Sequence, residues 1–112
     1  MIGNDIVDLN LACINSRWKE QRFLDKLFTK EEQTFILKDK LRHQNIWMLW
    51  SMKESAHKIH ARSLTSSIFN PKIYCCEMIS ETTGMVSFEG KTVFTTTNCN
   101  LNLIYTTAYG QD

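Results

Sequence analysis

The chain has 112 residues and a formal net charge of +1, and 43% of its residues are hydrophobic and 22% charged. This length and composition are typical of one globular domain, so we expect residues 1–112 to form a single domain. The near-neutral charge gives no electrostatic case for nucleic acid or an anionic membrane as a partner. No apolar run approaches the ~20 residues of a membrane-spanning helix, and Asp5 and Asp8 interrupt the apolar N-terminus, so we predict a cytoplasmic protein.

The first half of the chain predicts one strand followed by three helices. Ile2–Leu9 has the apolar content of a short strand. Ser16–Leu27 carries apolar residues near helical spacing. Thr29–Glu32 has the form of a capping box, which predicts a second helix that runs to about Leu41. The third and longest helix is expected over Gln44–Ala61, with a packed apolar stripe.

The composition changes after Ser63, where β-branched and aromatic residues become frequent. Glu89 and Gly90 form a plausible tight turn between two of the strands expected there. The order of strand, helices and then several strands predicts an α+β fold, with helices packed on a largely antiparallel sheet. The four later strands are expected at Lys72–Ile79, Met85–Phe88, Thr92–Thr97 and Leu101–Ala108.

Asp5, in the segment GNDIVDL, is the first candidate site residue. Side chains alternate across a strand, so Asp5 and Val7 share one face while Asp8 lies on the other and should not bind the same ion. A bare carboxylate among apolar neighbours is costly to bury. A metal ion or a basic partner would remove that cost. The alternative is structural: Asp5 caps a nearby helix or pairs with a lysine.

The segment WSMKESAHK supplies the second candidate, because Trp50, Glu54 and Lys58 fall on one stripe of the long helix. The simplest interpretation of Glu54 and Lys58 is a surface ion pair, worth only about 0.3–0.5 kcal/mol. Trp50 argues against it, because it draws the same stripe toward the interior. A carboxylate and an amine beside a core tryptophan suggest a functional site.

Histidines and cysteines give weaker metal signals. Glu54-x-x-His57 resembles a carboxylate–iron motif of helical bundles, but the second motif that such a site needs is not evident. His57 and His60 could hold zinc, yet spacing marks no third ligand, and packed or exposed histidines are the default. The four cysteines contain no Cys-x-x-Cys pair, so we expect reduced thiols.

Three segments in this order, GNDIVDL, LFTKEE at Leu27–Glu32 and WSMKESAHK, resemble the 4′-phosphopantetheinyl transferase superfamily. The family pattern is roughly Gly-x-Asp, then Phe-Ser/Thr-x-x-Glu, then Trp-x-x-Lys-Glu-Ala-x-x-Lys. The chain matches each segment, with Ser55 in place of the alanine. The combination covers about the first half of the chain and is more specific than any one segment.

The resemblance implies an enzyme that moves the phosphopantetheine arm of coenzyme A onto a serine of an acyl or peptidyl carrier protein. It implies Mg²⁺ or Mn²⁺ at the pyrophosphate, with Asp5 and Glu54 on the metal-ligand positions. Lys58 falls on the family's lysine, which contacts phosphate, and Glu54 is also a candidate base. Glu32 matches the family pattern, but its capping role accounts for it, so we do not assign it to catalysis.

Two departures from the family bear on activity and assembly. The larger, two-lobed members carry a second acid at the position of Val7. In having no acid at this position, the chain is similar to the small single-lobed members. Small members also carry a His-x-Ser-x-Ser/Thr-His segment, which the end of this chain, NCNLNLIYTTAYGQD, lacks. An alternative is therefore a catalytically weak relative that binds coenzyme A or a carrier protein without transfer. A single lobe implies a cleft completed by another copy, so we predict a homo-oligomer, with a trimer favoured.

Overall fold

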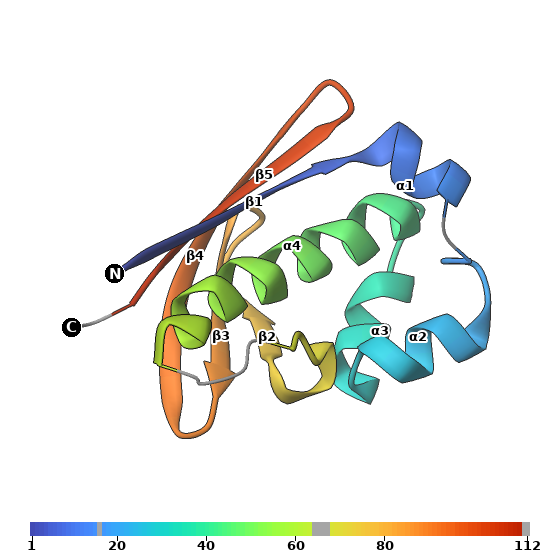
Figure 1. Ribbon diagram of the computed structural model, residues 1–112. Coiled ribbons are helices and arrows are strands. Elements are labelled where there is room, and N and C mark those ends of the chain that lie inside the picture. Colours follow the sequence, from blue (N-terminus) through green and yellow to red (C-terminus); the bar gives the residue numbers. More distant parts are fainter. Residues whose placement is uncertain (16, 64–67, 111–112) are drawn as a thin grey trace.

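The computed structural model describes residues 1–15, 17–63 and 68–110. It contains a five-stranded antiparallel sheet in the order β1-β5-β4-β3-β2, which confirms the predicted fold class. The first and last strands are neighbours, with Ile2 opposite Tyr109 and Asp8 opposite Leu103. Both chain ends consequently lie at one end of the sheet (Figure 1). The strands are β1 (Ile2–Asp8), β2 (Cys75–Met78), β3 (Thr83–Phe88), β4 (Lys91–Asn100) and β5 (Leu103–Tyr109).

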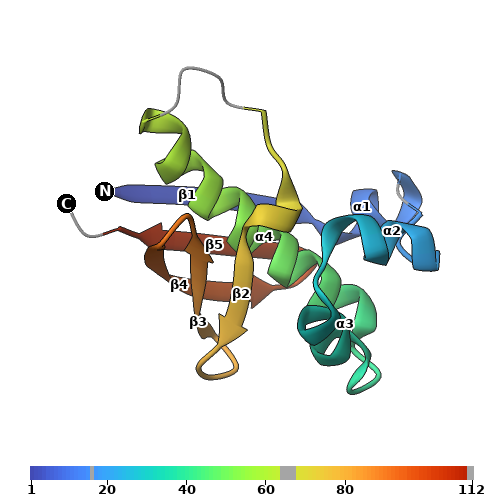
Figure 2. The same ribbon diagram turned by 90° about the horizontal axis from the view of Figure 1, so that it is seen from below.

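The helices cover one face of this sheet. Helix α4 crosses it, and the three shorter helices gather around one end of α4 (Figures 1 and 2). No helix in the described ranges is both long and apolar enough to cross a bilayer. The α-helices are α1 (Leu9–Asn15), α2 (Gln21–Leu27), α3 (Lys30–Leu37) and α4 (Arg42–His60), followed by the 3₁₀ turns η1 (Ala61–Ser63) and η2 (Pro71–Ile73).

The N-terminal boundaries differ most from the sequence prediction. The strand ends at Asp8, whose carboxylate accepts hydrogen bonds from the backbone N–H groups of Asn10 (3.0 Å) and Leu11 (3.1 Å). These bonds begin α1 at Leu9, where the apolar pattern had predicted continued strand. The helix predicted over Ser16–Leu27 begins only at Gln21, and Ser16 lies outside the described residues.

The later boundaries differ where turns intervene. Pro71 opens a 3₁₀ turn, so β2 begins at Cys75 and not at Lys72. Strand β4 extends past Thr97 to Asn100, and Leu101 adopts φ +56° in the turn that follows. The predicted Glu89-Gly90 turn is present between β3 and β4.

The hydrophobic core lies between α4 and the inner face of the sheet. Inward residues alternate along each strand with exposed ones, as expected for a sheet covered on one side. Burying such side chains is worth about 1.5–3 kcal/mol each, which fixes α4 on the sheet. The contributing residues are Val7, Val86, Val93, Ile104 and Ala108 from the strands, and Ile46, Leu49, Met52, Ala56 and Ile59 from α4.

Helix α3 begins with the predicted capping box. The hydroxyl of Thr29 accepts from the Glu32 backbone N–H (3.2 Å), and Glu32 Oε1 accepts from the Thr29 N–H (2.8 Å). Glu32 Oε2 accepts from the N–H of Cys76 at 2.7 Å. Both carboxylate oxygens of this buried side chain are therefore in use.

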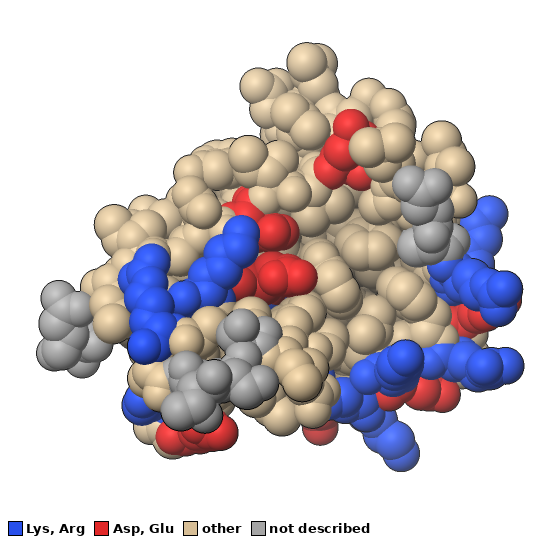
Figure 3. Space-filling view, viewed as in Figure 1, with Lys and Arg blue, Asp and Glu red and all other residues tan. Residues whose placement is uncertain are grey.

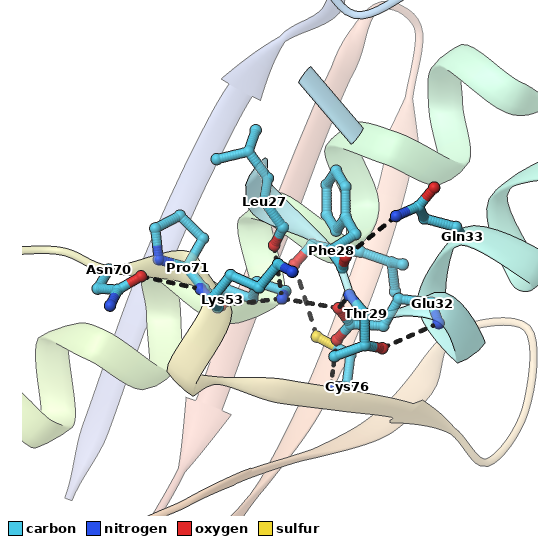
Figure 4. A network of polar contacts seen from close by, with 11 residues as sticks. Leu27, Phe28, Thr29, Glu32, Gln33, Lys53, Asn70, Pro71 and Cys76 are labelled. Carbon is cyan, nitrogen blue, oxygen red and sulfur yellow. Dashed lines mark hydrogen bonds and ion pairs between the residues drawn. The ribbon is translucent and has the colours of Figure 1, made fainter. Parts of the chain in front are cut away.

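Lys53, a fully buried residue of α4, completes this network (Figure 4). Its ammonium donates to Glu32 Oε1 (2.8 Å) and to the carbonyl oxygens of Leu27 (3.0 Å) and Pro71 (2.9 Å). Three acceptors match the three N–H donors of a lysine. The pair thus ties α2, α3 and η2 to α4, and its role is structural.

Candidate active site

Strand β1 and helix α4 touch at the point where the site is formed. A Cβ atom added to Gly3 would overlap the carbonyl oxygen of Ser55 on α4. Glycine is therefore needed for this close approach. Gly3, Asp5 and Val7 alternate onto the inner face, so the close packing at Gly3 brings the side chain of Asp5 against α4.

Lys58 reaches from α4 to this strand. Its ammonium lies 3.7 Å from Asp5 Oδ1 and donates to the carbonyl oxygen of Asn4 at 2.5 Å. The Lys58 side chain is 47% exposed and that of Asp5 is 15% exposed, so the pair lies at the rim of the interior. The surface pair considered for Glu54 and Lys58 is not formed between them. One oxygen of Asp5 does have the lysine partner that its structural interpretation predicted.

The other oxygen of Asp5 has no such partner. Oδ2 is buried and makes no hydrogen bond with any described residue. Burial raises the pKa of Asp5 to about 6, opposed by the positive charge of Lys58 and assisted by the negative charge of Glu54. The hydroxyl of Ser51 lies close enough to lower this pKa, but it makes no well-formed hydrogen bond to Oδ2. A buried carboxylate oxygen at the junction of β1 and α4 thus has unused capacity to accept a hydrogen bond or to bind a cation.

Glu54 lies on α4 one turn before Lys58 and is partly buried. Its carboxylate forms no hydrogen bond or ion pair with the described residues. The negative charge of Glu54 contributes to the raised pKa of Asp5, so the two carboxylates are near enough to interact electrostatically. Figure 3 shows acidic atoms gathered beside basic ones over the region where β1 and α4 meet. Charged groups of both signs therefore occur together on this part of the surface.

Comparison with known proteins identifies the family of the chain. The 4′-phosphopantetheinyl transferase superfamily matches residues 1–103 of the chain. The chain belongs to this superfamily. A search of curated proteins finds no match.

Solved structures of this superfamily share the fold over almost the whole chain. Holo-[acyl-carrier-protein] synthase from Neisseria meningitidis has a TM-score of 0.77 and 14% identity, covering 99% of this chain and 97% of that one. The Helicobacter pylori holo-[acyl-carrier-protein] synthase, solved in complex with coenzyme A, has a TM-score of 0.78 and 13% identity, covering 99% and 100%. The likeness at these identities establishes the fold, and the superfamily membership supports a phosphopantetheinyl transferase.

The carboxylates of this superfamily member suit a hard divalent cation. Asp5 offers a buried oxygen without a partner, and Glu54 offers a whole carboxylate. The described residues contain no cluster of three or more His, Cys, Asp or Glu that could hold a metal. Val7 is buried in the core, so the inner face of β1 carries a single acid, Asp5. Mg²⁺ is commonly bound by one or two carboxylates together with water and substrate phosphates, which is what this pair can provide.

The two histidines are packed side chains, as the default predicted. His57 and His60 are buried, and the Nδ1 atom of each lies 2.8 Å from the hydroxyl of Tyr74. The sequence did not indicate this network. Tyr74 precedes β2 as an isolated tyrosine, and no local pattern links it to residues 14 and 17 positions earlier.

Proposed function

We propose that this protein transfers the 4′-phosphopantetheine arm of coenzyme A to a serine of an acyl or peptidyl carrier protein, in a reaction that requires Mg²⁺ or Mn²⁺. The observation that carries the proposal is the carboxylate pair of Asp5 and Glu54 at the junction of β1 and α4, with one buried oxygen lacking a partner. In the metal-free protein, burial raises the pKa of Asp5 and the negative charge of Glu54 adds to this effect, so a bound cation would favour the ionised carboxylate.

Each residue has a distinct role in this reaction. Asp5 and Glu54 would hold the cation, which when bound supplies positive charge at the pyrophosphate. Lys58 is half exposed and directs its ammonium to the same rim, where it adds positive charge as negative charge accumulates. Glu54 would also serve as the base that accepts the proton of the attacking serine, directly or through a metal-bound water. The serine oxygen forms a bond to phosphorus, the pyrophosphate P–O bond breaks, and adenosine 3′,5′-bisphosphate leaves with the electron pair.

Coenzyme A as the substrate is supported by the relative from Helicobacter pylori, which was solved in complex with it. The structural match covers 100% of that chain and 99% of this one.

We also propose that the protein is a homo-oligomer, with a trimer favoured. Among the described residues, no helix covers the outer face of the sheet, which exposes a row of apolar side chains that are cross-strand neighbours. Ile2 lies opposite Tyr109, and Tyr109 lies opposite Phe94. These three residues are 57%, 47% and 45% exposed. A contiguous apolar surface of this kind is typical of a protein interface.

A second copy is the occupant that this face fits, because β1 forms both an edge of the face and one wall of the carboxylate site. A neighbouring copy at that edge would complete the cleft of a single-lobed enzyme. Light scattering should give a mass above that of the monomer, and Phe94→Glu should shift it to the monomer. A wild-type protein that stays monomeric at high concentration would contradict this assembly.

The second candidate function is binding of coenzyme A without transfer. The observation that favours it is the absence of the family's histidine segment, since β5 carries Tyr105, Thr106 and Thr107 and no histidine. Calorimetry with coenzyme A and Mg²⁺, run beside a transfer assay, separates the two. Binding without transfer would favour this candidate.

Mass spectrometry of an apo carrier protein incubated with coenzyme A, Mg²⁺ and this protein tests the main proposal. Carrier proteins of fatty-acid synthesis and of secondary metabolism should both be offered. The expected result is a mass gain equal to one phosphopantetheine arm, lost when Mg²⁺ is chelated and lost in Asp5→Ala and Glu54→Ala. Transfer that survives chelation or either substitution would refute the corresponding assignment.

A further inference from the structure

Four polar side chains outside the carboxylate site form one hydrogen-bonded chain. His57 Nδ1 and His60 Nδ1 each lie 2.8 Å from the hydroxyl oxygen of Tyr74, and His60 Nε2 lies 3.1 Å from Glu89 Oε2. His57, His60 and Tyr74 are 7%, 3% and 1% exposed, whereas the Glu89 side chain is 62% exposed. A hydroxyl from the segment before β2 therefore holds two histidines that lie one turn apart on α4.

The acceptor groups determine where the hydrogen atoms lie in this series of hydrogen bonds. The carboxylate of Glu89 can only accept, so His60 Nε2 must carry a hydrogen. In the neutral form of His60, Nδ1 is bare and accepts from the hydroxyl of Tyr74, and the Tyr74 oxygen can then accept from His57 Nδ1–H. Burial, with the charges of Glu89 and Glu54 adding to it, raises the pKa of Tyr74 to about 12, which keeps the hydroxyl protonated. The two histidines are consequently held as opposite tautomers.

Glu89 occupies a backbone conformation that its residue type disfavours. It has φ +48° and precedes Gly90 at φ +74°, in the two-residue turn between β3 and β4. Hairpin turns with two positive φ values favour Asn, Asp or Gly at the first of these positions. In the described part of the chain, the Glu89 side chain makes one hydrogen bond, to His60. That contact accounts for glutamate at a position where asparagine would suit the backbone better.

This hydrogen-bonded chain adjoins the part of α4 that carries the carboxylate site. Glu54 lies one turn before His57, and Lys58 follows His57 directly. On the β1 side, this turn is held by the bond from Lys58 to the carbonyl oxygen of Asn4. On the opposite side it is held by Tyr74. The turn of α4 that follows Glu54 is thus held by contacts on both of its flanks.

We propose that Tyr74 is a positioning residue for the carboxylate site. By holding His57 and His60, with Glu89 behind them, its hydroxyl fixes the turn of α4 from which Glu54 faces Asp5. This inference rests on the proposed function, because it assigns to Glu54 a part in binding a divalent cation. Partners that orient metal-binding side chains typically change metal affinity or activity by about 10-fold to 100-fold when they are removed.

Tyr74→Phe is the direct test. The variant retains the ring, whose centroid lies 5.9 Å from that of Phe69 and 5.3 Å from that of Phe88, and removes the hydroxyl. We expect the affinity of the protein for Mn²⁺, measured by electron paramagnetic resonance without substrate, to fall about 10-fold or more. In the transfer assay kcat should fall more than KM for coenzyme A changes. Urea denaturation checks that both proteins are folded under the assay conditions.

Glu89→Asn provides a second test on an exposed residue. Asparagine suits the left-handed turn, so this variant should be folded, but it cannot support His60 with a carboxylate. We expect weaker Mn²⁺ binding and a lower kcat, without a loss of stability. Leu101→Asn is the matched control, because Leu101 also has a positive φ, +56°, and is 92% exposed in a turn away from the histidines. It should leave Mn²⁺ affinity and kcat unchanged.

A Tyr74→Phe protein with wild-type Mn²⁺ affinity and kcat would overturn the proposal. If that variant does not fold, an unchanged Mn²⁺ affinity in Glu89→Asn would overturn it equally. Nitrogen NMR of the histidines adds a third measurement, since opposite tautomers are expected for His57 and His60, and identical neutral tautomers would contradict the hydrogen-bond order. Failure of the proposed function is distinct: the wild type itself would transfer no arm, while Mn²⁺ affinity would still report on Tyr74.

Discussion

Helix α4 carries two lysines, Lys53 and Lys58, and each pairs with a carboxylate from another part of the chain. Lys53 is fully buried and lies 2.8 Å from Glu32, and every donor and acceptor of that pair is used. Lys58 is half exposed and lies 3.7 Å from Asp5, which keeps one buried oxygen without a partner. The Lys53–Glu32 pair has no polar atom left to bind a ligand, whereas the Lys58–Asp5 pair has one.

On this helix, a structural ion pair differs from a functional one in whether all of its hydrogen-bonding groups have partners. The closeness of the two charges does not distinguish them. A buried pair persists when hydrogen bonds satisfy its remaining groups. An unsatisfied buried oxygen has a free-energy cost, and a function explains why it is retained. Substitutions in each pair test this distinction. Those in the Lys53–Glu32 pair should mainly change stability, and those in the Lys58–Asp5 pair should mainly change transfer.

The largest effect on stability is expected from Lys53→Met. This change leaves the Glu32 carboxylate buried without its cation, and breaking a buried pair from one side costs about 3–5 kcal/mol. Urea denaturation monitored by tryptophan fluorescence measures the loss. A loss below that of Lys58→Met would show that the Lys53–Glu32 pair is not the structural one.

Asp5→Asn should change stability in the opposite direction to Lys53→Met. It should raise the free energy of unfolding at neutral pH while abolishing metal-dependent transfer. The pKa of Asp5 is raised from 3.8 to about 6 in the folded state, so the folded state binds this proton more tightly than the unfolded state. The stability that this provides is present below pH 4 and is lost as the pH rises through 6. Removing the charge should therefore stabilise the metal-free protein at pH 7 by up to about 3 kcal/mol.

Urea denaturation in a chelator, repeated between pH 4 and pH 7, checks this sign. The stability of the wild type should decrease relative to that of Asp5→Asn across this interval. Parallel curves for the two proteins would show that Asp5 titrates normally and is not held in a destabilising position.

Lys58→Met should have the smallest effect on stability, about 0–1 kcal/mol, because the pair is partly exposed and poorly aligned. Its effect should fall on transfer, since the ammonium is lost from the rim of the site. Lys58→Arg is the matched control that keeps the charge, and it should retain more activity than Lys58→Met. Equal transfer by wild type and Lys58→Met would remove Lys58 from the site.

The sequence predicted those parts of the molecule that depend on neighbouring residues. The capping box of Thr29 and Glu32 and the long helix were both predictable, because their signals lie within a few positions of each other. Helix α1 was not, because the apolar residues after Asp8 suit a strand as well as a helix. The side-chain hydrogen bonds of Asp8 that decide between them depend on the folded geometry.

The residues of the candidate site were proposed from the sequence, whereas their contacts are known only from the structure. The family resemblance selected Asp5, Glu54 and Lys58, and the structure brings Asp5 to Lys58 across 53 positions of sequence. The local spacing had suggested that Lys58 pairs with Glu54 instead. The hydrogen bonds of Tyr74 to His57 and His60 were not predicted, because the two histidines lie on α4 and no sequence periodicity connects them to Tyr74. Tertiary contacts of single residues leave no local pattern.

The central claim is that Asp5 and Glu54 bind one divalent cation together. It is tested most directly by titrating the substrate-free protein with Mn²⁺ and following the free ion by electron paramagnetic resonance, for the wild type, Asp5→Asn, Glu54→Gln and the control Glu77→Gln, an exposed acid of β2. We predict one Mn²⁺ per chain in the wild type and in Glu77→Gln, and none at the same concentrations in Asp5→Asn or Glu54→Gln. Undiminished Mn²⁺ binding in either of those two variants would contradict the account.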